Sequence, residues 1–510
     1  MKKLLLVFIY FPIVNLTSFA QAPAIQWQKA LGGTGFENTS SIQQTTDGGY
    51  VASGYSQSTN GDVTENKGGT DLWVVKVSNA GDIQWQKSFG GSEADYSNQI
   101  QQTLDGGYIM TGSTNSTDGD VSGNHGSYDV WVVKLSSSGD LQWQKSLGGS
   151  GTDYGYSIQQ TTIGDYFITG STNSNNGDVI GNHGSQDVWI VKLSITGDLH
   201  WQKTLGGTNG DQAYTIKPTS DGGCVLAGYS TSNDGDVTVN HGNKDVWIVK
   251  LNDMGSIQWQ KSFGGTDEDG ANSIQQTADN GYIVAGYTKS SNGDIISNHG
   301  NFDFWILKLS NSGGLEWQKT YGGLGDDLAN CIQQTTDGGY IVTGYSSSTE
   351  GDISANYGNN DFWVIKLSNT GYLEWQKTLG GSNNDMANSI QQTSDGGYVV
   401  SGYTFSNDDD VATNHGDNDG WIVKLAPDPL ARSIFTSNSF TLYPNPAQKT
   451  LQLQTNTTID KIIITDLSGK IILEQRQNTN QVNIEQLSVG MYFIEVFSGD
   501  EKFTSKFMKK

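Results

Sequence analysis

The chain has 510 residues and a net charge of −24, from 29 Lys plus Arg against 53 Asp plus Glu. Such an acidic chain repels phosphate backbones, which argues against nucleic-acid binding. Its only cysteines are Cys224 and Cys331, so a disulfide scaffold is excluded and we expect two free thiols.

The first twenty residues predict a secretory signal peptide. Lys2 and Lys3 precede the apolar run LLLVFIYFPIV, and the small residues of SFA end at Ala20. This run is too short to span a bilayer comfortably, so cleavage after Ala20 is favoured over an uncleaved anchor. The rest of the sequence contains no run apolar enough for a transmembrane helix. We therefore expect the mature chain to be exported.

From residue 25 to residue 425 the sequence repeats every 58 residues, in seven copies without insertion or deletion. In the third copy, SIQQTT (157–162), YFITGST (166–172), DVWIVKL (187–193) and DLHWQKTL (198–205) have strand composition and are separated by turns and one long polar loop. Gly197 can supply the positive φ that the last hairpin needs. The fold class predicted from this pattern is all-β, a seven-bladed β-propeller of four-stranded repeats. A parallel β-helix, whose coils are usually shorter, is the alternative.

The two ends of the repeat region complement each other. The region begins with a WQK strand at Ile25, whereas the seventh copy ends after DGWIVKL and has no WQK strand of its own. We expect residues 25–33 to complete the seventh blade, because this pairing closes the ring and removes exposed sheet edges. The predicted propeller spans residues 21–426.

The repeat GGSGTDYGYSIQQTT…YFITGSTNS…DVWIVKLSITGDLHWQKTLGG resembles the SBBP-type β-propeller repeat of bacterial secreted proteins. Its last hairpin, with G-x-x-x-W, is also similar to quinoprotein-dehydrogenase propeller repeats. The resemblance implies a propeller. It implies no particular reaction, because one fold carries many functions.

Strand alternation places the long polar loops and the connections between copies on one side of the propeller, called here the long-loop face. We expect ligands to bind there, because loops held by a rigid scaffold commonly carry function. The candidate binding residues are Asp120, Asn124, His125, Asp178, Asn182, His183, Asp236, Asn240, His241, Asp294, Asn298 and His299. Histidines at equivalent positions of separate blades are not expected to converge on one zinc ion.

One set of loop carboxylates could hold Ca²⁺, which prefers oxygen ligands. The set is Asp62, Asp120, Asp178, Asp236, Asp294, Asp352 and Asp410. The sequence has no EF-hand loop, and Asp and Asn side chains readily cap turns by bonding nearby backbone amides, so capping is favoured over metal binding. No other cofactor is expected.

After Leu425 the repeat stops. Residues 427–438 have the composition of a linker, and residues 439–510 alternate strand and turn patterns that predict a small C-terminal β-sandwich. YPNP, the DLSGK hairpin, GMYF and the basic end resemble the type A C-terminal sorting domain of type IX secretion substrates from Bacteroidota. The matching residues are Tyr443, Pro444, Asn445, Pro446, Gly490, Tyr492, Lys509 and Lys510. An ordinary accessory β-domain is the alternative.

The sorting-domain resemblance implies a partner and a route. The partner is the type IX secretion machinery, and the route leads through the periplasm to the outer-membrane surface or the medium. Removal of the tail, with release or surface attachment, would follow.

The sequence contains none of the motifs HExxH, GxSxG and P-loop, and SSSGDLQW lacks the Asp and the spacing of the sialidase box. No catalytic residue is assigned. We favour a non-enzymatic surface propeller that binds a glycan or a protein. The alternatives are a polysaccharide hydrolase or lyase and a purely structural surface protein. A carboxylate pair with one raised pKa would favour the enzyme, whereas equivalent shallow sites would favour a multivalent binder.

Two departures from the repeat stand out. Lys217-Pro218 replaces Gln-Gln, and Ile163-Gly164-Asp165 replaces DGG. Lys217 is expected to face the central channel, although a single change after duplication is more often drift than a site.

Overall fold

The computed structural model describes residues 21–428, 441–454, 459–466, 470–476, 480–498 and 501–510. The predicted signal peptide and residues 429–438 of the predicted linker lie outside the described residues. The chain divides into two compact units, Met1–Leu430 and Ala431–Lys510, and each is treated separately below. All regular elements of the described residues are strands, so the protein is all-β.

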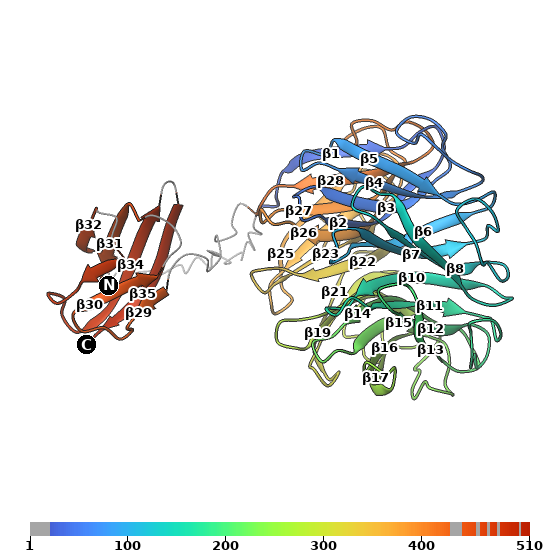
Figure 1. Ribbon diagram of the computed structural model, residues 1–510. Helices are drawn as coiled ribbons and strands as arrows, with labels where there is room; N and C mark the ends of the chain where they lie inside the picture. Colours follow the sequence, from blue (N-terminus) through green and yellow to red (C-terminus); the bar gives the residue numbers. More distant parts are fainter. Residues whose placement is uncertain (1–20, 429–440, 455–458, 467–469, 477–479, 499–500) are drawn as a thin grey trace, which may run out of the picture. The chain divides into compact units, whose positions relative to one another are not determined.

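The first unit contains seven four-stranded antiparallel sheets (Figure 1). Their first strands are β2 (Glu37–Gln44), β6 (Asp95–Gln102), β10 (Asp153–Gln160), β14 (Asp211–Pro218), β18 (Asp269–Gln276), β22 (Asp327–Gln334) and β26 (Asp385–Gln392). Their second strands are β3 (Tyr50–Ser56), β7 (Tyr108–Thr114), β11 (Tyr166–Thr172), β15 (Cys224–Ser230), β19 (Tyr282–Thr288), β23 (Tyr340–Ser346) and β27 (Tyr398–Thr404).

The third strands are the most deeply buried: β4 (Asp71–Val77), β8 (Asp129–Leu135), β12 (Asp187–Leu193), β16 (Asp245–Leu251), β20 (Asp303–Leu309), β24 (Asp361–Leu367) and β28 (Asp419–Leu425). The fourth strands are β5 (Ile83–Phe89), β9 (Leu141–Leu147), β13 (Leu199–Leu205), β17 (Ile257–Phe263), β21 (Leu315–Tyr321) and β25 (Leu373–Leu379) for six sheets, and β1 (Ile25–Leu31) for the seventh.

The seventh sheet combines the two ends of the repeat region. β1 pairs antiparallel with β28, and the Trp421 indole N–H donates to the Gln28 side-chain oxygen at 2.7 Å. The same bond joins the third and fourth strands of the other sheets, as between Trp189 and Gln202 at 2.8 Å. β2 also contacts β26 and β27, so the first and last sheets lie side by side.

The first strand of the third sheet begins earlier than predicted. In the third sheet β10 begins at Asp153, four residues before the predicted start, and ends at Gln160. Its polar and small residues do not look like a strand, but they pair with β11 through a register shift between Gly155 and Ser157. This bulge brings the Tyr154 carbonyl so close to Gly170 that a Cβ there would overlap it.

Apolar side chains fill the space between adjacent sheets. Leu72 and Val74 of the first sheet pack with Met110 and Trp131 of the second in one buried cluster, and equivalent clusters recur along the chain. Each third strand is therefore covered on both faces, which explains its continuous run of apolar residues.

The described residues of the second unit form two sheets. β29 (Thr441–Tyr443), β30 (Thr450–Gln454) and β33 (Gln481–Asn483) form one, and β32 (Ile471–Gln475), β31 (Lys461–Thr465), β34 (Gly490–Ser498) and β35 (Glu501–Lys509) form the other. Leu451 and Val482 of the first sheet share a buried cluster with Ile462, Ile494 and Phe507 of the second.

Candidate functional site

The long-loop carboxylates tie adjacent sheets together. The Asp178 backbone N–H donates to the Gly148 carbonyl at 2.8 Å, and the Asp178 carboxylate accepts the Gly148 N–H at 3.2 Å. Gly148 follows β9, the last strand of the preceding sheet. Both bonds recur at Asp62, Asp120, Asp236, Asp294 and Asp352, and Asp410 makes the backbone bond. These oxygens are thus engaged in capping a neighbouring backbone turn.

The loop asparagines hold the long loops in shape. The Asn182 amide donates to the Thr172 carbonyl at 3.2 Å, and its oxygen accepts the Gly184 N–H at 2.9 Å. The equivalent residues Asn66, Asn124, Asn240, Asn298, Asn356 and Asn414 make the same pair of bonds. Their amides therefore rigidify the loop from within.

Five histidines occupy one loop position and form a repeated His–Asp pair. These five loop histidines are His125, His183, His241, His299 and His415, and in each the Nδ1 atom lies 2.5–2.8 Å from the Oδ2 atom of the Asp four residues later. The histidine side chains are 35–42% exposed, whereas the partner Asp side chains are 0% exposed. No described residue bonds the Nε2 atoms, so each ring is fixed at one nitrogen and leaves the other unbonded.

Lys67 and Tyr357 take this loop position in the first and sixth sheets. The Lys67 ammonium pairs with Asp120 of the next sheet, and the Tyr357 backbone N–H donates to Asp361. The structure places one Asp, one Asn and one His of the candidate set in each of four consecutive long loops, where each side chain has its own bonding partners. It brings no group of three or more His, Cys, Asp or Glu side chains of the described residues close enough to hold a metal ion.

Next to the glycine that follows each fourth strand lies a pair of buried carboxyl groups. This pairing was not predicted from the sequence. A Cβ built on Gly90 would lie 2.6 Å from both Asp71 Oδ1 and Asp95 Oδ2, so only glycine fits between them. The seven pairs are Asp71–Asp95, Asp129–Asp153, Asp187–Asp211, Asp245–Asp269, Asp303–Asp327, Asp361–Asp385 and Asp419–Glu37. All fourteen side chains are completely buried.

Burial perturbs the titration of these groups. It raises the pKa of Asp71 to about 6 and that of Asp361 to about 7, and the nearby carboxyl of each pair adds to the shift. The Oδ1 atom of all seven third-strand Asp residues has no hydrogen-bond partner among the described residues. These pairs have the raised pKa that catalysis would need, but they are sealed from solvent and repeated in every sheet. They are therefore a structural feature, because a substrate cannot reach them.

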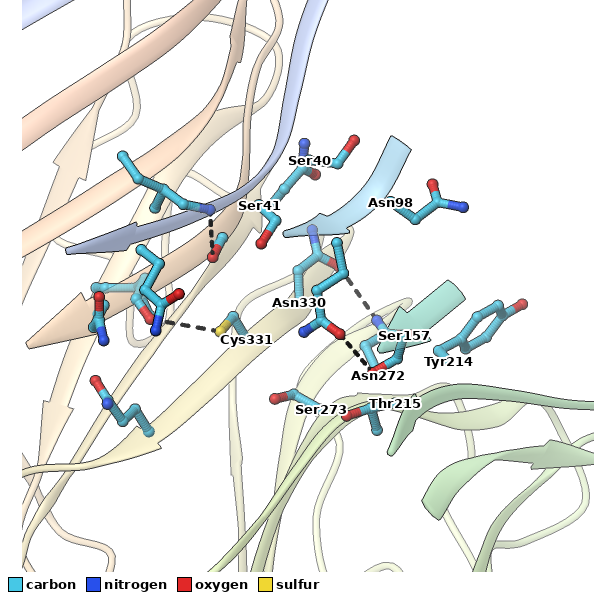
Figure 2. A pocket seen from close by; sticks show the side chains of 18 of the residues that line it. Ser40, Ser41, Asn98, Ser157, Tyr214, Thr215, Asn272, Ser273, Asn330 and Cys331 are labelled. Carbon is cyan, nitrogen blue, oxygen red and sulfur yellow. Dashed lines mark hydrogen bonds between the residues drawn. The ribbon is translucent and has the colours of Figure 1, made fainter. Parts of the chain in front are cut away.

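A cavity of about 350 Å³ lies where the first strands of all seven sheets meet. Figure 2 shows Ser, Asn, Tyr and Cys side chains of different strands around this space. Several of them bridge neighbouring strands, as the Asn272 amide does by donating to the Ala329 carbonyl at 2.9 Å. Among the described residues the lining contains no Asp or Glu, and Lys217 is its one formally charged group.

In the second unit the sorting motifs meet although about sixty residues separate them. Asn445 accepts the Met508 N–H at 3.0 Å and donates to the Lys506 carbonyl at 3.3 Å. Two residues later, Ala447 forms an isolated β-bridge with Lys509. The positions of the remaining motif residues are as follows: Tyr443, Pro444, Pro446 and Lys510 are exposed, Gly490 begins β34, Tyr492 is buried against Phe507, and Lys509 is buried. Of the predicted DLSGK hairpin, residues 467–469 lie outside the described residues, and the Lys470 N–H donates to Asp466 at 3.1 Å.

Within the described residues no helix has the length and apolar character needed to cross a membrane. Both cysteines are free thiols, with Cys224 buried and Cys331 half-buried.

Several solved structures are similar to this chain at low identity. PorZ, a surface component of the type IX secretion system of Porphyromonas gingivalis, is 11% identical with a TM-score of 0.39, over 94% of this chain and 60% of PorZ. The extracellular domain of a hybrid two-component system from B. thetaiotaomicron is 9% identical with a TM-score of 0.41, over 93% of this chain and 57% of that one. Puromycin hydrolase is 10% identical with a TM-score of 0.43, over 76% of this chain and 54% of the hydrolase.

The chain thus spans 54–60% of the length of these three proteins, and likenesses of this degree indicate no shared function. No curated protein matches the chain. Residues 441–510 match the family described as the secretion system C-terminal sorting domain, which confirms that the tail carries a sorting domain. Residues 441–510 therefore belong to the sorting domains that direct type IX export to the cell surface or the medium.

Proposed function

We propose that residues 21–426 form a closed seven-bladed β-propeller, joined by a linker at 427–438 to a β-sandwich sorting domain at 439–510. The pairing of β1 with β28 and the contacts of β2 with β26 support closure, because they give the first and last sheets a neighbour. Residues 1–20 serve as the signal peptide for the first export step, and the sorting domain directs the second.

The proposed activity is non-enzymatic binding of a surface glycan or protein at the long-loop face. The observation that carries it is the set of five loop histidines, each held by a buried Asp and each leaving Nε2 unbonded. Asn and Asp side chains rigidify the same loops, so little conformational entropy is lost when a ligand binds. Exposed Ile180 and Ile296, each three residues before a loop histidine, add apolar contact area.

The contrast with the carboxyl pairs supports binding over hydrolysis. A hydrolase needs one accessible pair of carboxyl groups, whereas this chain repeats seven inaccessible ones. Five equivalent exposed groups instead suit a multivalent binder, whose weak contacts combine into high avidity. Calcium is not required by this proposal, because the loop carboxylates already bond backbone amides.

The test is a screen of the purified full-length exported protein on an array of surface glycans and surface proteins, with calcium and again with EDTA. We expect a reproducible hit that weakens by about tenfold or more when His125, His183 and His241 are all replaced by Ala, because three contacts of a multivalent surface are lost. His200→Ala is the matched control, since His200 is exposed but pairs with Asp165 outside the long loops. A hit that survives in the triple variant would contradict the proposal, and loss in EDTA would give calcium a role.

A further inference from the structure

Side-chain amides hold the first strands together around the central cavity. The Gln101 oxygen accepts the backbone N–H of Gln160 in the next sheet at 2.7 Å, and five of the seven sheets make this bond. The two missing bonds flank β14. Pro218 has no N–H to offer Gln159, and the Lys217 ammonium cannot accept the N–H of Gln276.

A second row of bonds is interrupted at the same place. The Gln160 oxygen also accepts the Leu104 N–H at 2.8 Å, and six of the seven sheets make the equivalent contact. The missing one is at Thr162, which faces Pro218 instead of a Gln. Lys217 and Pro218 together therefore account for every bond that is missing from the two rows in the described part of the chain. Losing these bonds costs stability, and no structural gain offsets the loss.

Lys217 also introduces an uncompensated charge. Its ammonium has no hydrogen bond or ion pair with any described residue, whereas Lys250 of the same sheet lies 2.9 Å from Asp221. Burial lowers the pKa of Lys217, because no carboxylate among the described residues of the cavity offsets the cost of its charge, and a bound anion would supply that offset. The chain carries a net charge of −24, but the one formal charge among the described residues of this cavity is positive, so the cavity favours an anion.

We propose that the central cavity binds a small sugar acid, with Lys217 holding the ligand carboxylate. Hydroxyl and amide side chains such as Ser273, Asn272 and Asn330 line the same space and match a ligand rich in hydroxyl groups (Figure 2). Tyr156 and Tyr214, whose ring centroids lie 5.1 Å apart, also line the cavity and add aromatic surface that can contact the apolar side of a sugar ring. A cavity of about 350 Å³ is at the small end of ligand pockets, which suits one or two sugar units.

This site goes beyond the binding proposed for the long-loop face. Lys217 lies near the end of β14 that leads into the short turn, on the opposite side from the long loops. Replacing it therefore leaves the loop histidines untouched, and the two proposals fail independently.

The experiment is calorimetric titration of the full-length protein with sodium galacturonate. Galactose is the ligand control that lacks the carboxylate, and sodium acetate is the control that lacks the hydroxyl groups. Trigalacturonate tests whether the cavity accepts the end of a chain as well as a free sugar. Lys217→Gln restores the residue of the other copies and should fold at least as well as the wild type. Lys87→Gln, which removes an exposed charge paired with Asp140, is the matched control variant.

We expect galacturonate to bind more tightly than galactose or acetate, and K217Q to weaken it by about tenfold or more, because a charge-assisted contact is lost. K87Q should bind like the wild type. Acylation of lysines followed by mass spectrometry gives a second readout, in which galacturonate protects Lys217 and galactose does not. Equal galacturonate affinity in K217Q and the wild type, or no protection of Lys217, would overturn the proposal.

Discussion

Replacing Asp361 with Asn is expected to stabilise the protein at alkaline pH. Burial is the main reason that the pKa of Asp361 rises to about 7, and the charge of Asp385 adds to it. A group whose folded-state pKa lies above its unfolded value of 3.8 contributes stability that is complete below pH 3.8 and is lost as the pH rises through 7. The Asn variant does not ionise and avoids this loss.

The size of the effect follows from the shift. About three pKa units correspond to at most about 4 kcal/mol of unfolding free energy at about pH 8. The Asn oxygen can still accept the Tyr357 N–H, and its amide can donate toward Asp385, whose Oδ1 atom has no partner among the described residues. Losing a charge-assisted bond offsets part of the gain, so we expect a net stabilisation of about 1–3 kcal/mol.

The assay is urea unfolding followed by tryptophan fluorescence at about pH 4.5 and about pH 8, where the lower pH removes most of the charge penalty. D303N is the matched control. The Nδ1 atom of His299 lies 2.6 Å from the Asp303 carboxylate, and replacing Asp303 with Asn removes this His–Asp pair. We expect D303N to gain less than D361N. A D361N variant that is equally stabilised at both pH values, or destabilised at pH 8, would show that the charge of Asp361 does not limit the stability of the fold.

Three further predictions concern the fold and its export. Gly402→Ala should destabilise the protein by about 3 kcal/mol or more in thermal unfolding, because the new Cβ overlaps a backbone carbonyl of β26. Gln28→Ala should cost about 1–3 kcal/mol, measured by urea unfolding, since it leaves the buried Trp421 indole N–H without its partner. Deleting residues 441–510 should abolish export, which cell fractionation would show as protein retained in the periplasm.

Much of the fold could be predicted because the repeat displays it seven times. The second and third strands of the third copy coincide with the predicted segments, as YFITGST does with β11. The early start of β10 was missed, because Asp153 and Gly155 carry no strand signal and pair only through a bulge. A bulge is a property of two strands together and leaves little trace in either one.

The candidate site was less predictable, since its key contacts are set by tertiary structure. Asp71 and Asp95 begin strands β4 and β6 of neighbouring sheets, and their meeting around Gly90 depends on how the sheets pack. The His–Asp pairs, in contrast, have a visible signal in the four-residue spacing from His183 to Asp187.

One departure from the repeat has a structural explanation. In six sheets the Asp of the short turn between the first and second strands pairs with a Lys of the third strand, at 2.9–3.0 Å. In the third sheet this Asp lies two positions later, as Asp165, and its carboxylate lies 3.6 Å from the Lys192 ammonium. This change is compensated within its own sheet. The change at Lys217 is not, because no described residue pairs with its ammonium.

If the long-loop face binds ligands as proposed, it presents several equivalent binding sites. Native mass spectrometry of the full-length protein with a monovalent form of an array hit counts the ligands bound per chain. We expect up to five ligands per chain, matching the five loop histidines, and we expect the number to fall as histidines are replaced by Ala. A single ligand per chain that is insensitive to these replacements would contradict this expectation.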